Sequence, residues 1–324
     1  MNDHARLDRL ALLFMSIVCL VPLQRSLAVI IFEAPGRSES MPVLAGGVNP
    51  GWQYVGQLGA FSGTPIGPRA WVSATHLNMT TGSLLYDNAG TTALNSYAST
   101  RVTTSGDLAV YTLDTVVPDF TEWAPVWSDP NQLTANMDVY MYGRGTERGS
   151  EITNGWRWGG ADTDLSFGTN QLSGLSAIGA DMYLVMEFNE PTPSNGLPST
   201  EGILSPGDSG GSIFGYNSNT ARWELIGINY AVETVADQPN SNYINAAIYD
   251  ARGYYVPNTP TLISWDTPVP LSSFSTSLPH KYAFLSPYIP VPEPGTFLFG
   301  GIGAVLLIYL WRRSYPNGPI RSVE

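Results

Sequence analysis

The sequence predicts an all-β protein with many turns between its two ends. Its 324 residues include 33 glycines and 25 prolines, and 43% of them are hydrophobic. Short runs of β-branched and aromatic residues recur between clusters of Gly, Pro, Asn and Asp, a pattern typical of strands joined by tight turns. No long stretch between the termini repeats its apolar residues with helical spacing. The apolar content is sufficient for a core that buries about 70% of the unfolded surface.

The first 28 residues have the organisation of a secretory signal peptide. Arg6 and Arg9 precede an apolar run at 10–23, and Ser26-Leu27-Ala28 offers a cleavage site of the small-x-small type. This apolar run is short for a membrane span. The only cysteine, Cys19, lies within it. We therefore expect an exported chain that contains no disulfide and depends on its core for stability.

Two groups of predicted strands are separated by a proline-containing segment at 114–136. The strands of the first group are predicted at 53–61, 69–75, 83–86, 99–103 and 108–113. Those of the second group are predicted at 137–142, 151–158, 182–188, 212–216, 222–230 and 243–248, followed by a short helix at about 248–254.

The C-terminal part contains a predicted stalk and a sorting signal. Residues 256–290 are rich in Pro, Ser and Thr, which predicts an extended stalk without a packed core. Val291-Pro292-Glu293-Pro294-Gly295 follows, and then an apolar run at 297–311 and Arg312-Arg313. Residues 291–313 resemble the PEP-CTERM sorting signal of Gram-negative bacteria. The resemblance implies a transient transmembrane helix, processing by an exosortase near Pro294, and release or transfer to the cell surface. A plain C-terminal membrane anchor is the alternative.

The charge of the chain excludes one class of partner. The formal net charge is −12, whereas nucleic-acid binding needs a basic surface. Such an acidic balance favours solubility and does not identify a substrate.

Three short blocks contain the residues of a candidate catalytic site. Trp71-Val72-Ser73-Ala74-Thr75-His76 ends on a histidine. Gly106-Asp107-Leu108-Ala109-Val110-Tyr111 has an aspartate at its second position, directly before a predicted strand. Pro206-Gly207-Asp208-Ser209-Gly210-Gly211 places a serine between glycines, which allow close approach to the backbone. In this order the blocks resemble the signature motifs of trypsin-like (chymotrypsin-fold, S1-type) serine proteases.

The resemblance implies two antiparallel six-stranded β-barrels with the active site between them. The domain would cover 43–255, with barrels at about 43–113 and 137–255, and would end in a short C-terminal helix. The resemblance assigns Ser209 as the nucleophile, His76 as the general base and Asp107 as the residue that orients the imidazole. Gly207 and Ser209 would supply the oxyanion-hole N–H groups. No cofactor or metal ion is required.

Alternatives to these assignments are few. Asp87, beside a predicted turn, and Asp114, at the end of a strand, compete with Asp107. Gly207-Asp208-Ser209-Gly210-Gly211 also satisfies the nucleophile elbow of α/β-hydrolases, but that fold needs its histidine after the serine. The only histidine there is His280, within the predicted stalk.

The resemblance also marks positions that bind substrate. Ile203 stands six residues before the serine, at the family's pocket base, which predicts apolar or small side chains at the cleavage position. Asn229-Tyr230-Ala231 replaces the family's Ser-Trp-Gly strand. Asp208 would pair with a freed N-terminal ammonium. The candidate ammonium groups arise from a cut near Val43-Leu44-Ala45-Gly46-Gly47 or from signal cleavage before Val29.

Together these features predict an exported serine endopeptidase that acts on protein or peptide substrates through an acyl-enzyme. One alternative is a catalytically inactive protease-like module for adhesion or matrix binding. Another is an exported esterase that uses the same three side chains.

Overall fold

The computed structural model describes 29–33, 38, 40–45, 47–87, 94–161, 163–234, 246–255 and 261–290. The predicted signal peptide and the predicted membrane helix lie outside these residues. Within the described ranges, no helix is both long and apolar enough to cross a membrane. The described residues through Tyr288 belong to one compact unit.

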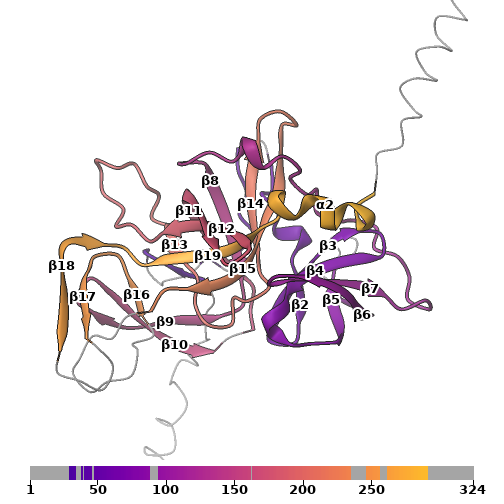
Figure 1. The fold of residues 1–324 in the computed structure, drawn as a ribbon, viewed down its shortest axis with the longest axis horizontal. Helices are drawn as coiled ribbons and strands as arrows, with labels where there is room; N and C mark the ends of the chain where they lie inside the picture. Colours follow the sequence, from indigo (N-terminus) through magenta and orange to yellow (C-terminus); the bar gives the residue numbers. More distant parts are fainter. Residues whose placement is uncertain are drawn as a thin grey trace, which may run out of the picture. The chain divides into compact units, whose positions relative to one another are not determined.

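The first barrel is closed by six antiparallel strands, in the order β2-β3-β4-β7-β6-β5 (Figure 1). They are β2 (Gly56–Leu58), β3 (Phe61–Gly67), β4 (Ala70–Ala74), β5 (Thr81–Tyr86), β6 (Asn95–Ser105) and β7 (Leu108–Leu113). Trp71 and Tyr111 stack at its centre with ring centroids 4.0 Å apart. A Cβ on Gly63 would come within 2.7 Å of the Trp71 ring, so the barrel needs glycine there.

The second barrel is also closed, in the order β11-β12-β19-β15-β14-β8. Its strands are β8 (Asp138–Gly143), β11 (Ser166–Ile178), β12 (Asp181–Glu187), β14 (Ser212–Asn217), β15 (Arg222–Val232) and β19 (Ser272–Ser277). Met141, Leu184 and Ile213 are among the fully buried residues of its core. The two barrels confirm the predicted all-β double-barrel architecture, which fits the chymotrypsin fold.

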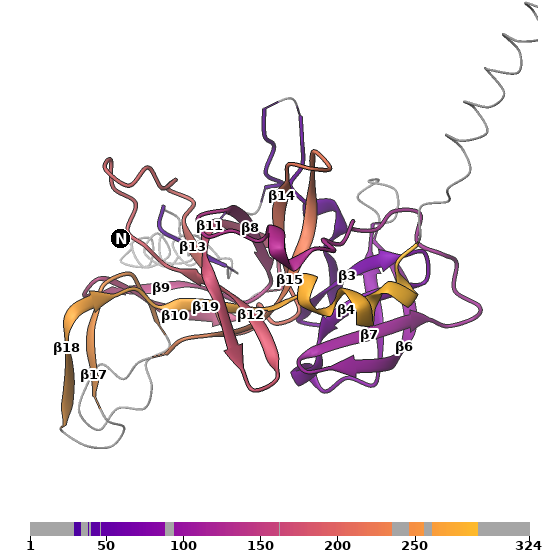
Figure 2. The same ribbon diagram turned by 45° about the horizontal axis from the view of Figure 1, so that its top comes forward.

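Three smaller sheets surround the second barrel. β1 (Ile30–Ile31) pairs with β13 (Gly202–Ile203), and β16 (Ala246–Ile248), β10 (Gly155–Ala161) and β9 (Thr146–Ile152) form a three-stranded sheet. β17 (Ala251–Tyr255) and β18 (Leu262–Val269) form a two-stranded sheet at the left edge of both views (Figure 2).

Short helical turns complete the unit. Four of them are η1 (Trp52–Tyr54), η2 (Thr75–Leu77), η3 (Pro130–Gln132) and η4 (Pro279–Lys281), and the last two are α2 (Tyr282–Leu285) and η5 (Ser286–Tyr288). The C-terminal turns lie beside the first barrel in both views (Figures 1 and 2). A short C-terminal helix is therefore present as α2, at a later position than the 248–254 predicted for it.

The prediction of a stalk at 256–290 is wrong. β19 lies between β12 and β15 and closes the second barrel, and both Leu271 and Leu278 are buried. Its serines are buried as well, and two of them bond to neighbouring segments of the fold: Ser273 Oγ accepts from Leu204 N–H at 3.0 Å, and Ser275 Oγ donates to Asn229 Oδ1 at 3.2 Å. Composition misleads here because hydroxyl groups with internal partners are compatible with a core. The domain therefore extends well beyond residue 255.

Two predicted elements and one boundary also need correction. The segment expected as a helix at about 248–254 instead holds the end of β16, a short turn and most of β17. The single strand expected at 151–158 is a hairpin of β9 and β10, which turns at Asn154 with φ of 60°. The folded unit begins before residue 43, because β1 pairs with β13.

Candidate active site

His76 lies in a helical turn that connects β4 to the rest of the first barrel. β4 is buried along its whole length and leads directly into η2, which ends at Asn78 in the left-handed region. Thr75 N–H donates to the Asp107 carbonyl at 2.9 Å, and His76 N–H donates to Asp107 Oδ1 at 2.9 Å. Two backbone bonds therefore fix the histidine against the start of β7.

Asp107 occupies a two-residue turn between β6 and β7. Ser105 and Leu108 face each other across this turn, and Gly106 adopts φ of +60°. Both carboxylate oxygens of Asp107 lie 2.9 Å from His76 Nδ1. Nδ1 therefore carries the ring proton, and Nε2 presents its lone pair on the opposite side of the ring.

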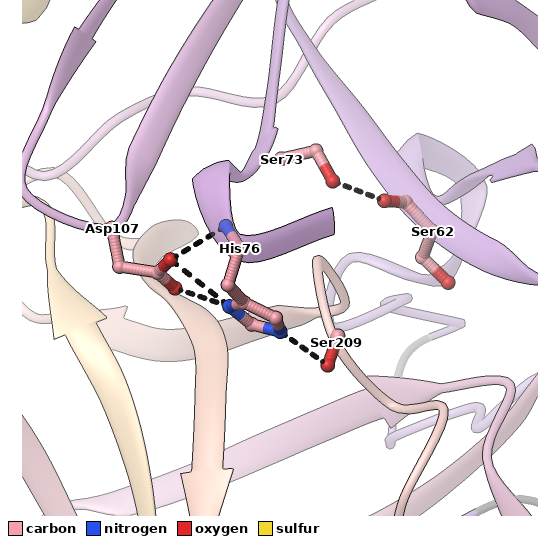
Figure 3. Close-up of polar contacts among 5 residues, drawn as sticks. All are labelled: Ser62, Ser73, His76, Asp107 and Ser209. Carbon is pink, nitrogen blue, oxygen red and sulfur yellow. Dashed lines mark hydrogen bonds and ion pairs between the residues drawn. The ribbon is translucent and has the colours of Figure 1, made fainter. Parts of the chain in front are cut away.

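Ser209 completes the arrangement from the second barrel. Its Oγ lies 2.7 Å from His76 Nε2, so the three side chains form one hydrogen-bonded chain (Figure 3). The serine loop lies against the first barrel, where Ser73 Oγ donates to the Ser62 carbonyl at 2.7 Å. A Cβ on Gly210, which has φ of +75°, would overlap both groups of that bond. Glycine at 210 is what lets the loop approach His76 this closely.

Two amide groups of the serine loop point to no acceptor. The N–H groups of Asp208, Gly210 and Gly211 donate to the carbonyls of Ser205, Asn229 and Asp208 at 3.0–3.1 Å. Within the described part of the chain, the N–H groups of Gly207 and Ser209 donate to no protein atom. Within the described residues, no protein acceptor therefore competes for these two N–H groups.

Asp208 is buried beneath this loop. Its carboxylate accepts from Gly145 N–H at 2.8 Å and from Ser205 N–H at 2.7 Å and Oγ at 3.0 Å. Val29 N lies 3.4 Å from Oδ1. Burial raises the pKa of Asp208 to about 6, and these hydrogen bonds lower it in part. Its hydrogen-bond donors are therefore uncharged groups, and none of the described residues pairs a cation with it.

The segment that starts at Val29 is fixed at several points. Val29 is fully buried with φ of 35°, and Ile30 pairs with Ile203. Arg148 Nη1 donates to the Phe32 carbonyl at 2.7 Å, and the Phe32 ring meets Trp156 edge-on at 5.2 Å. Of the two candidate sources of an ammonium, the structure brings Val29 to Asp208, whereas Val43 is 62% exposed.

A small cavity opens beside Ser209. Its volume is about 80 Å³. It is lined by Leu204, Ser205, Pro206, Asp208, Ser209, Asn229, Tyr230, Ala231 and Val232. Three of the four predicted substrate-binding positions, Asn229, Tyr230 and Ala231, therefore border it.

Ile203 does not line this cavity, which corrects the prediction for the pocket base. It packs with Ile30 and Phe188 in a separate buried cluster. Successive residues of an extended chain point to opposite sides, so its neighbour Leu204 faces the cavity instead.

Asn229 connects the serine loop to the second barrel. Its Nδ2 donates to the Tyr142 carbonyl at 2.9 Å and to the Asp208 carbonyl at 3.1 Å. Its Oδ1 accepts from Ser275 Oγ at 3.2 Å. Sequence reasoning missed Ser275, because the composition of its segment indicated a stalk.

The competing residues lie elsewhere. Asp114 is exposed and accepts from Thr100 Oγ1 at 3.3 Å, and Asp87 lines a different cavity. His280 lies in η4, where its Nδ1 is 2.8 Å from Ser277 Oγ. In the described residues, no group of three or more His, Cys, Asp and Glu is placed to hold a metal ion.

Comparison with known proteins identifies the C-terminal segment. Residues 290–314 match the model of the PEP-CTERM protein-sorting motif, which indicates export and sorting to the cell envelope or surface of Gram-negative bacteria. No curated protein sequence matches the chain. Among solved structures, the apo MamO protease domain of Magnetospirillum magneticum is similar at 16% sequence identity and a TM-score of 0.40. The match covers 75% of this chain and 99% of that one.

Proposed function

We propose that this protein is an exported serine endopeptidase that uses His76, Asp107 and Ser209. The observation that carries the proposal is the continuous hydrogen-bonded chain from the Asp107 carboxylate through the imidazole to Ser209 Oγ. A hydroxyl is a weak nucleophile until an adjacent base accepts its proton, and His76 Nε2 is at hydrogen-bonding distance for that transfer.

Acylation would begin when Ser209 Oγ attacks the carbonyl carbon of a peptide bond and its proton passes to His76 Nε2. The carbonyl oxygen becomes an oxyanion, to which the N–H groups of Gly207 and Ser209 donate, and each donor contributes about 10²–10³ in rate. The tetrahedral intermediate collapses as the C–N bond breaks and His76 transfers the proton to the leaving amine. Asp107 holds the ring in the productive tautomer and stabilises the imidazolium.

Deacylation repeats these steps with water. His76 accepts a proton from the water molecule as its oxygen attacks the acyl carbon. The C–O bond to Ser209 then breaks, and the serine oxygen regains its proton from the imidazolium. The carboxylic acid product leaves the free enzyme.

Signal cleavage would complete the oxyanion site. A cut after Ala28 converts the Val29 nitrogen from an amide into an ammonium at the position that is 3.4 Å from Asp208 Oδ1. The buried carboxylate would then have the cation that its environment otherwise lacks. The bonds from β13 and Arg148 to the following residues support this placement of the mature N-terminus.

The sorting signal gives the proposed route. The apolar run at 297–311 would anchor the chain in the membrane for a time, and an exosortase would cut near Pro294. This cut follows Tyr288, the last residue of the compact unit, so the released protein would keep the whole double barrel.

The cavity beside Ser209 supports a preference for small apolar side chains. Its volume of about 80 Å³ is small, and the one acidic group on its wall, Asp208, is only 1% exposed. The described residues of its wall therefore offer no exposed charge to a Lys or Arg side chain of the substrate.

A fluorophosphonate probe tests the proposed chemistry. The wild-type protein should be labelled and should cleave peptides, and Ser209→Ala should do neither. A folded wild-type protein that resists labelling would instead support the inactive adhesion or matrix-binding module. Labelling with turnover of esters, but not of proteins or peptides, would support the esterase.

A further inference from the structure

The turn that carries Asp107 is held by residues of the C-terminal segment and the second barrel. Lys281 of η4 donates from Nζ to Ser105 Oγ at 3.0 Å, and also to Asp181 Oδ1. Ser105 is the last residue of β6, two positions before the carboxylate that faces His76. One ammonium group therefore bonds to both barrels.

Asp181 packs directly on the same turn. It is the first residue of β12 and follows the tight turn from β11. A Cβ added to Gly106 would overlap the Asp181 carboxylate. Glycine at 106 is needed both for its φ of +60° and for this close approach.

The ion pair between Lys281 and Asp181 is largely shielded from water. The side chain of Lys281 is 14% exposed and that of Asp181 is 17% exposed. Ion pairs on an open surface contribute little to the free energy of folding. Removal of the cation from a buried ion pair, in contrast, strongly destabilises the folded protein. The pair therefore constrains the turn more than a surface contact would.

A second contact links β12 to the histidine. The Tyr183 ring, two residues after Asp181, lies 4.7 Å from that of Tyr230, which in turn lies 5.9 Å from the His76 ring. Burial raises the pKa of Tyr183 to about 12, and the charges of Asp181 and Asp107 add to the shift. The start of β12 is thus linked to the His76 ring through Tyr230.

We propose that Lys281 and Asp181 are positioning residues that hold the Ser105-Gly106-Asp107 turn where the Asp107 carboxylate meets His76 Nδ1. Neither residue lines the cavity beside Ser209, so they act through Asp107 and not on the substrate. Lys281 is the only lysine of the chain. Its ammonium is a compact group with three donors, which suits two oxygen acceptors on different elements. The inference rests on the proposed peptidase function.

The main test compares Lys281→Met and Asp181→Asn with the conservative Lys281→Arg. We expect both disruptive variants to lower kcat about 10- to 100-fold, because a misplacement of about 1 Å at a catalytic group has effects of this size. KM should stay near the wild-type value, and Lys281→Arg should recover part of kcat. Arg252→Met is the matched control, because it removes a cation from an exposed ion pair with Asp250 and should change neither constant.

A double-mutant comparison separates positioning from a general effect on folding. In an Asp107→Asn background, Lys281→Met should cause no further loss of kcat, since its effect passes through Asp107. The double variant Lys281→Met, Asp181→Asn removes both charges and so avoids an unpaired buried carboxylate if the single variant fails to fold. We expect this double variant to fold and to show the same reduction in kcat as the single variants. If Lys281→Met lowered kcat by the same factor in the wild-type and the Asp107→Asn backgrounds, the proposal would be overturned.

A spectroscopic readout keeps this test independent of the proposed function. The proton on His76 Nδ1, shared with Asp107, should give a downfield proton NMR signal that broadens or disappears in Lys281→Met but not in Arg252→Met. If the wild-type protein is inactive, the proposed peptidase function is refuted, but the NMR signal still tests whether Lys281 positions Asp107. If the wild-type protein is active and Lys281→Met retains both kcat and the signal, the positioning role is refuted and the function stands.

Discussion

The main-chain nitrogen of Val29 and the buried carboxylate of Asp208 lie 3.4 Å apart, although 179 residues separate them in the sequence. Asp208 directly precedes the candidate nucleophile, and Val29 directly follows the predicted signal cleavage site. The residue that the predicted signal cleavage would leave as the N-terminus is thus placed beneath the serine loop.

The first prediction concerns the charge at Val29. A protein that begins at Val29 should react with a fluorophosphonate about 10²-fold faster than one that begins at Ala28, because only the former places an ammonium beside Asp208 and orders the oxyanion site. The measurement is the second-order labelling rate, with both N-termini verified by mass spectrometry. Equal rates for the two proteins would show that the oxyanion site forms without this ion pair.

The second prediction concerns stability and pH in the chain that retains Ala28. Burial raises the pKa of Asp208 from 3.8 to about 6, so the folded state binds its proton more tightly than the unfolded state does. The stabilisation is complete below about pH 4 and is lost as the pH rises through 6, a change on the order of 2–3 kcal/mol. Urea unfolding from pH 4 to 7 measures this loss. Asp208→Asn should lose about 2–3 kcal/mol less over this range, because only the loss from other groups remains, chiefly Glu201, whose pKa burial raises to about 8. A loss equal to that of the wild type would contradict the assignment.

The third prediction concerns Asp107. Asp107→Asn should lower kcat about 10⁴-fold, because the amide would favour the wrong imidazole tautomer. Asp114→Asn is the matched control, since Asp114 is exposed and bonds to Thr100. Steady-state kinetics on a chromogenic peptide compare the two variants. A larger effect from Asp114→Asn would transfer the acid role to Asp114.

The fourth prediction concerns substrate choice. Peptide anilides with Ala at the cleavage position should be cut at least about 10-fold faster than those with Phe or Arg, because the cavity beside Ser209 is small and lacks an exposed charge. Val232→Ala should widen the cavity and reduce the disadvantage of Phe. Preferential cleavage after Arg would rule out this view of the pocket.

The fifth prediction concerns the C-terminal boundary. A chain that ends at residue 290 should fold and keep activity, whereas one that ends at 255 should be degraded by added protease, because β19 is needed to close the second barrel. Limited proteolysis with mass spectrometry of the surviving fragment provides the readout. A protease-resistant, active fragment that ends at 255 would show that the barrel closes without β19.

The sequence was most informative where chemistry depends on short local motifs. The blocks around His76, Asp107 and Ser209 predicted which side chains the fold brings together, because each block sets its own turn and strand. The double barrel followed from the same resemblance.

The sequence was least informative where the structure depends on pairing between segments that are far apart in the chain. The serines of β19 look like linker residues until their barrel partners are known, and Ile203 faces its own cluster because β13 pairs with β1. The contacts of Lys281 with Ser105 and Asp181 span at least 100 residues, so local patterns could not reveal them. The presence of a single lysine was the one available signal.

For the proposed peptidase, the position of β19 would also determine when the protein can become active. A chain that is exported with its N-terminus leading delivers Val29, His76 and Ser209 across the membrane well before residues 272–277. The second barrel cannot close until that last strand arrives, so it remains open throughout most of translocation. Late closure of this kind would protect the cytoplasm and the export machinery from premature proteolysis.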